Sequence, residues 1–109
     1  MEHRERRLAE NEALFREVNE RVEAIARLHG SDDHVYEFYC ECSNVDCTKH
    51  VPATILEYEA VRQHPSRFLV FPSHDLPDIE RVVDRGEAWW VIEKVGEAGE
   101  LVAQLDPRS

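Results

Sequence analysis

The chain has 109 residues, a formal net charge of −10 and three cysteines. This length suits a single domain with one modest core. The acidic balance argues against nucleic acid as the main ligand, because a phosphate backbone binds positive charge. No apolar run is long enough to span a membrane, the first residues lack a signal-peptide pattern, and the thiols form no disulfide pattern. We therefore expect a cytoplasmic protein.

Residues 2–29 contain neither Pro nor Gly and are rich in Glu, Arg, Leu and Ala, which predicts a long amphipathic helix. Gly30 and the polar residues 31–33 are expected to end it. We assign residues 1–30 to this N-terminal helix and residues 31–109 to a zinc-stapled α+β body, within one domain overall. The 3–4 spacing of the helix predicts a face made of Leu8, Asn11, Phe15, Val18, Val22 and Ile25.

The helix is expected to be longer than the body that it adjoins. Val18, Val22 and Ile25 should pack on the chain's own sheet. Residues 8–15 would extend beyond a body of about 80 residues, where little surface remains to cover them. We therefore expect this outer part to contact a protein partner or a second copy of the chain, with Asn11 setting the register of the paired helices.

The body begins with a β-branched and aromatic segment, residues 34–40, that is typical of a strand. Residues 48–51 could pair with it as a hairpin, and Pro52 should end that pairing. The sequence from Thr54 to Glu57 has the Thr-x-x-Glu form of a capping box and predicts a helix to about His64. The predicted buried side of that helix comprises Ile55, Leu56, Tyr58 and Val61.

The last third of the chain is predicted to contain short strands. Residues 68–71 predict an apolar strand that ends in a turn containing His74. Residues 79–84 and 89–95 predict a hairpin whose adjacent Trp89 and Trp90 face opposite sides, one in the core and one as a candidate exposed anchor. Residues 100–106 could form a short helix or stay irregular. The predicted class is α+β, with a long N-terminal helix, a small antiparallel sheet, one further helix and a zinc knuckle.

All three cysteines lie within residues 40–47. Their odd number and the i,i+2 spacing of two of them argue against a disulfide framework. In an extended segment the side chains of Cys40 and Cys42 point the same way, and the turn-forming residues 43–46 could bring Cys47 to the same point. Zn²⁺ prefers thiolate and imidazole ligands, and a closed structural site needs four. We predict a Zn²⁺ site made of these thiols and one histidine.

Two histidines are candidates for the fourth ligand. His50 completes the local pattern Cys-x-Cys-x4-Cys-x2-His, which resembles the SWIM-type zinc finger, although the gap here is short and the last spacing is one residue longer. His74 lies on a turn directly after a predicted strand, from which a remote ligand can reach a knuckle.

Six segments of the chain form a recognisable set of motifs: Cys40-x-Cys42-x4-Cys47, Glu57-Tyr58-Glu59-x-Val61-Arg62, Arg67-Phe68-x-Val70, Pro72-x-His74, Glu80-Arg81-Val82-Val83 and Val91-Ile92-Glu93-Lys94. Together they resemble a family of small uncharacterised actinobacterial proteins. The likeness covers most of the chain, including part of the first helix. The resemblance implies that His74, rather than His50, completes the metal site, and it implies no activity.

A structural zinc site favours a protein–protein interaction or regulatory module, and we predict no catalytic residues. Three thiolates make zinc a poor Lewis acid, which disfavours the alternative of a zinc-dependent or Cys-based enzyme. A zinc-knuckle nucleic-acid binder is the other alternative. It is disfavoured by the acidic residues Glu37, Glu41 and Asp46 beside the cysteines.

Overall fold

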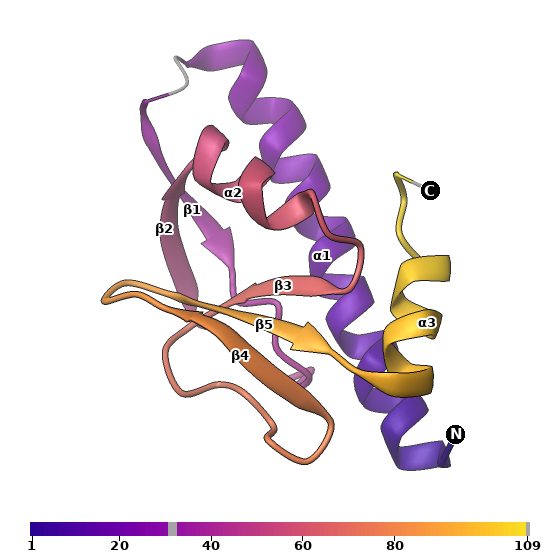
Figure 1. The fold of residues 1–109 in the computed structure, drawn as a ribbon. Helices are drawn as coiled ribbons and strands as arrows, with labels where there is room; N and C mark the ends of the chain where they lie inside the picture. The colour runs from indigo at the N-terminus through magenta and orange to yellow at the C-terminus, as the bar shows by residue number, and fades with distance from the viewer. Residues whose placement is uncertain (31–32, 109) are drawn as a thin grey trace.

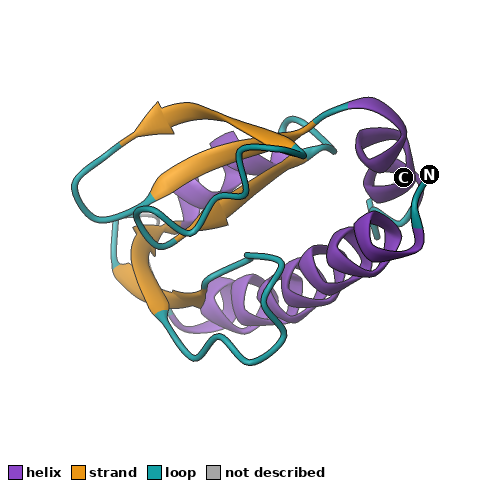
Figure 2. Ribbon diagram, turned by 90° about the horizontal axis from the view of Figure 1, so that it is seen from below, coloured by secondary structure: helices purple, strands orange, loops and turns teal. Residues whose placement is uncertain are grey.

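The structure is a computed structural model that describes residues 1–30 and 33–108. The long helix α1 (His3–His29) lies along one side of the molecule, beside two small antiparallel sheets (Figure 1). Seen from below, the strands and α1 enclose the core between them (Figure 2). No helix within the described ranges has both the length and the apolarity needed to cross a membrane.

The strands form a hairpin and a three-stranded sheet. The hairpin pairs β1 (Val35–Tyr39) with β2 (His50–Thr54), and the sheet has the order β3-β5-β4. The remaining elements are α2 (Ile55–Arg62), β3 (Arg67–Val70), β4 (Glu80–Arg85), β5 (Trp90–Lys94) and α3 (Gly96–Gln104). The predicted α+β class is confirmed, with two sheets rather than one and with α3 as an additional helix.

The predicted end of the hairpin at Pro52 is wrong. Pairing continues past Pro52, which lies opposite Glu37, as far as the pair of Val35 and Thr54. Each strand of a two-stranded sheet has one unpaired edge, and proline is tolerated where its missing N–H faces that edge.

The capping box at the start of α2 is confirmed. The Thr54 hydroxyl oxygen accepts the Glu57 N–H at 3.1 Å, and the Glu57 carboxylate accepts the Thr54 N–H at 2.9 Å. The predicted buried residues Ile55, Tyr58 and Val61 are buried, but Leu56 is 62% exposed. Leu56 directly follows Ile55, so it lies a quarter-turn away from the buried i,i+3 row.

The predicted buried face of α1 is wrong except at Val22, which is partly buried and packs against a core cluster. Ile25 is 60% exposed, whereas Leu8, Phe15 and Val18 are only partly buried. The face that packs on the body is mainly polar and alanine-rich, and it comprises Ala9, Glu12, Ala13, Arg16, Asn19, Glu23 and Ala26. A helix can bury such a face only if its polar groups find partners within the fold.

Arg16 and Glu12 show how those partners are supplied. The Arg16 guanidinium donates to the Val102 carbonyl and to the Pro65 carbonyl, both at 2.6 Å. The ammonium of Lys94 lies 2.5 Å from a Glu12 oxygen and 3.0 Å from a Glu80 oxygen, with all three side chains fully buried. These contacts tie α1 to α3 and to the three-stranded sheet.

Helix α3 covers the N-terminal half of α1 (Figure 1). Ala9 is fully buried in a cluster with Ala98, Leu101 and Val102 of α3. The expectation that residues 8–15 extend beyond the body is therefore wrong, because the sequence did not define the helix that covers them. The contact with a partner or a second copy stays a prediction.

The predicted end of α1 is confirmed. The Gly30 N–H donates to the Ala26 carbonyl, and a Cβ at Gly30 would meet the Tyr36 hydroxyl oxygen at 1.7 Å. Ser31 and Asp32, which were also expected to end the helix, lie outside the described residues.

The predicted exposed tryptophan anchor is wrong. Trp89 and Trp90 pack against different core clusters, and both are partly buried, so neither is a freely exposed anchor.

Candidate metal centre

Four potential metal ligands meet at one point of the described structure. The Sγ atoms of Cys40, Cys42 and Cys47 and one ring nitrogen of His74 all lie within 4.8 Å of one another. The cysteines come from the connection between β1 and β2, and His74 comes from the loop after β3. The site thus joins the hairpin to the three-stranded sheet.

Backbone hydrogen bonds hold the first two cysteines in place. The Cys40 N–H donates to the Lys49 carbonyl at 3.1 Å, which continues the hairpin beyond its last strand pair. The Glu41 N–H donates to the Leu69 carbonyl of β3 at 2.8 Å. Cys40 and Cys42 are buried and Cys47 is partly buried.

A tight turn returns the chain to Cys47. The Asn44 side-chain oxygen accepts the Asp46 N–H at 3.0 Å, and the Asn44 carbonyl accepts the Cys47 N–H at 3.0 Å. Asparagine favours such turns because its side chain can replace a backbone acceptor. The predicted delivery of Cys47 by residues 43–46 matches this geometry.

A second turn places His74 beside the thiols. Ser73 adopts a left-handed conformation with φ of 69°, and the His74 N–H donates to the Phe71 carbonyl at 3.1 Å. The His74 Nδ1 then lies 3.5 Å from the Cys40 Sγ and 3.7 Å from the Cys47 Sγ. A left-handed serine is uncommon and marks a turn held in shape by its surroundings.

His50 lies elsewhere. It is exposed on β2, opposite Tyr39, with the two ring centroids 4.8 Å apart. The structure therefore brings His74, and not His50, into the group of close ligand atoms.

The donor set and its spacing fit a tetrahedral metal. Zinc–sulfur bonds of ~2.3 Å and zinc–nitrogen bonds of ~2.05 Å imply sulfur–nitrogen separations of about 3.6 Å at tetrahedral angles. The 3.5 and 3.7 Å separations to His74 are close to this value. These four residues could hold a metal ion.

The thiols perturb one another's protonation. A hydrogen bond between the Cys40 and Cys42 thiols, together with burial, raises the pKa of Cys40. The same hydrogen bond lowers the pKa of Cys42 to about 5. Burial raises the pKa of the Cys47 thiol. Three crowded thiols cannot all ionise without a compensating cation, so a bound cation would release protons as it binds.

Glu41 is a part of the site that sequence reasoning misassigned. It was expected beside the cysteines as a surface charge, but it is fully buried. One of its oxygens accepts the Leu69 N–H at 2.9 Å, and the other accepts from the Tyr58 hydroxyl at 2.7 Å and the Asn19 amide at 2.9 Å. The alternation of side chains along an extended segment could have revealed the burial of Glu41, because a residue between two ligands points away from the metal.

Two asparagines of α1 hold both ends of the Cys-x-Cys segment. The Asn19 side chain donates to the Tyr39 carbonyl and accepts the Tyr39 N–H, both at 2.8 Å. The Asn11 amide donates to the Ser43 carbonyl at 2.9 Å. Asn11 therefore serves the chain's own cysteine loop, whereas the sequence suggested a role in helix pairing.

Comparisons of the chain with family models, with curated proteins and with solved structures found no match. The resemblance to small actinobacterial proteins stays a prediction. The functional argument therefore depends on the site itself.

Proposed function

We propose that this chain is a small cytoplasmic interaction or regulatory module whose fold is held by one structural Zn²⁺. The convergence of Cys40, Cys42, Cys47 and His74 from two separate segments is the observation that carries the proposal. Three thiolates and one imidazole are a typical donor set of structural zinc sites.

The closed donor set favours a structural role over a catalytic one. Four protein ligands fill a tetrahedral shell, and catalytic zinc sites keep one position for water or substrate. A zinc ion bound here would neutralise the thiolates and cross-link the β1–β2 connection to the loop after β3. A zinc-dependent enzyme therefore has no specific observation in its favour.

The net charge of the whole chain disfavours nucleic-acid binding by the knuckle. Glu41 does not contribute to this argument as a surface charge, because it is buried. The chain carries a formal net charge of −10, and thiolate ligands would add to it. Counterion release from a phosphate backbone needs Lys or Arg at the interface.

Exposed apolar residues on α1 support the interaction part of the proposal. Leu14, Ile25 and Leu28 are 50%, 60% and 80% exposed, and their spacing places them along one side of the helix. Ile25 and Leu28 lie about one turn apart, whereas the exposed Arg21 separates them from Leu14, so the pair near the end of α1 is the part that a partner could cover. Sedimentation of the intact chain and of Leu28→Glu tests self-pairing, and a monomer in both cases would contradict it.

Metal analysis tests the zinc site directly. We expect about one zinc per purified chain, and we expect chelation to lower the melting temperature strongly and zinc to restore it. Structural zinc contributes on the order of 10 kcal/mol at neutral pH, which is comparable with the whole stability of a small domain. A metal-free preparation whose melting does not change with added zinc would refute the proposal.

A further inference from the structure

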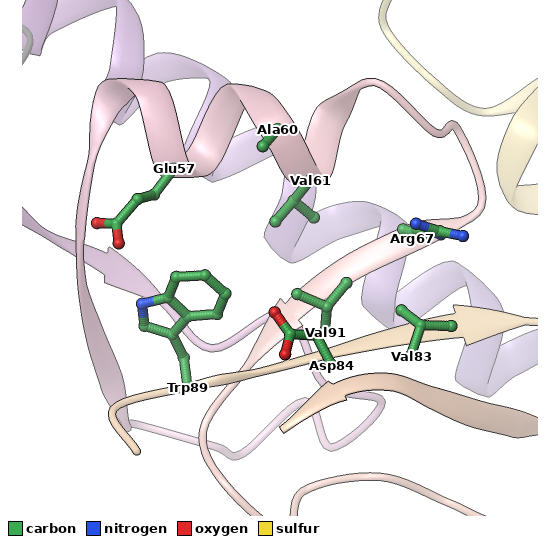
Figure 3. Close-up of a pocket in the computed structure, with 8 residues that line it drawn as sticks. All are labelled: Glu57, Ala60, Val61, Arg67, Val83, Asp84, Trp89 and Val91. Carbon is green, nitrogen blue, oxygen red and sulfur yellow. The ribbon is translucent and has the colours of Figure 1, made fainter. Parts of the chain in front are cut away.

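A cavity of about 390 Å³ lies between α2 and the three-stranded sheet, and it shares no residue with the metal centre. Its floor is apolar and includes Val61, Val83 and Val91. Glu57 and the indole of Trp89 lie at one end, and Asp84 lies nearer the middle, on the other side of the indole from Glu57 in this view (Figure 3). Arg67 lies towards the other end (Figure 3).

An irregularity in β4 accounts for the position of Asp84. Successive strand residues normally point to opposite faces, yet Val83 and Asp84 both line the cavity. The register of β4 against β5 shifts between Val82 and Asp84, which is the mark of a β-bulge. Bulges commonly re-aim a side chain next to a functional site. Here the bulge directs the Asp84 carboxylate into the cavity, beside its valines.

The Asp84 carboxylate lacks a counterion among the described residues, whereas the Glu57 carboxylate accepts the Thr54 N–H at 2.9 Å in the capping box. Asp84 makes no hydrogen bond or ion pair within the described residues. Its neighbour Arg85 lies over the ring of Trp90, 5.2 Å from the centroid, rather than beside Asp84. Arg67 is bound to Glu93 at 2.9 Å, so its charge is already compensated.

We propose that this pocket binds a lysine or arginine side chain of a partner protein. The cationic head would lie against the Trp89 ring between the carboxylates of Glu57 and Asp84, because an aromatic face and carboxylates both attract a cation. The valine floor suits the methylene stem of such a side chain. This inference rests on the proposed interaction function and names the chemistry of its partner.

Size and overall charge agree with this occupant. A cavity of about 390 Å³ is at the small end of ligand sites, which fits one side chain rather than a large cofactor. The net charge of −10 would attract a basic segment over distance. An anionic ligand would face the carboxylates of Glu57 and Asp84 beside the Trp89 ring.

The test uses the zinc-loaded full chain and the peptide acetyl-Gly-Gly-Arg-Gly-Gly-amide. Binding is followed by NMR through the backbone N–H signals of residues 84 and 91, which line the cavity and are present in every variant. The matched peptide carries citrulline, which keeps the shape of arginine without its charge. We expect the arginine peptide to bind more tightly, and we expect Asp84→Asn and Trp89→Leu each to weaken it about fivefold. Glu100→Gln, which removes an equal charge at an exposed position of α3, should have no effect.

Equal binding of the two peptides, or equal affinities of Asp84→Asn and Glu100→Gln, would overturn the inference. Free agmatine binding as tightly as the peptide would assign the pocket to a small amine and would also overturn it. Zinc content and melting temperature are measured on the same samples. Full zinc with no peptide binding refutes this inference alone, whereas a folded zinc-free chain refutes the proposed function.

Discussion

Replacing Glu41 with alanine tests whether the buried network behind the metal centre stabilises the fold. The change removes the acceptor of three donors, which are the Leu69 N–H, the Tyr58 hydroxyl and the Asn19 amide. The Asn19 amide keeps a second acceptor, the Tyr39 carbonyl at 2.8 Å. Two buried donors, the Leu69 N–H and the Tyr58 hydroxyl, therefore lose this acceptor.

The expected loss follows from these two donors. Each buried donor left unsatisfied costs about 1–3 kcal/mol, so together they would cost about 2–6 kcal/mol. Burial raises the pKa of Glu41, which means that removing the carboxyl group also relieves a desolvation cost. We therefore expect a loss near the lower half of this range, about 3 kcal/mol in the free energy of unfolding.

Urea unfolding of the zinc-loaded protein measures this loss. The matched control is Glu37→Ala, an exposed glutamate on β1 that should change stability by at most about 0.5 kcal/mol. Chelator competition should also show zinc affinity reduced by about 10–100-fold for Glu41→Ala, as for other residues that orient metal ligands. A Glu41→Ala protein as stable as Glu37→Ala would refute the reasoning.

Two further predictions concern the polar face of α1. Arg16→Met keeps the apolar stem but leaves the Pro65 and Val102 carbonyls without their donor, so urea unfolding should show a loss of about 2–4 kcal/mol, against almost none for the exposed Arg21→Met. A similar loss in both variants would contradict the assigned contacts. Burial raises the pKa of Glu12 well above its usual 4.5, so the folded state holds a proton that the unfolded state has lost. The free energy of unfolding should therefore fall as pH rises above about 4.5, and Glu12→Gln should flatten that slope in urea unfolding at several pH values. An unchanged slope would show that another group controls it.

Local chemistry made much of the site predictable. The spacing of Cys40, Cys42 and Cys47 and the turn formers between them act over eight residues, so no distant contact was needed to foresee their convergence. The capping box at Thr54 is local for the same reason. The choice between His50 and His74 was different, because it depends on the path that the chain takes through β3.

The face of α1 could not be read from apolar periodicity. A prediction from hydrophobic periodicity assumes that polar residues face water. Glu12 and Arg16 are instead buried against partners that lie far along the chain. The sequence did not define helix α3, because the glycines in this segment have a low helix propensity. Gly99 is required there by close packing, since a Cβ would meet the Lys94 carbonyl oxygen at 2.7 Å.

The zinc affinities of His74→Ala and His50→Ala, measured side by side by chelator competition, test the central claim most directly. A closed site that loses a ligand should lose more than the ~10–100-fold that removal of an outer-shell partner costs. We expect His74→Ala to exceed that loss and His50→Ala, exposed on β2, to bind zinc like the unaltered chain. Equal losses, or a larger loss for His50→Ala, would contradict the assigned metal centre.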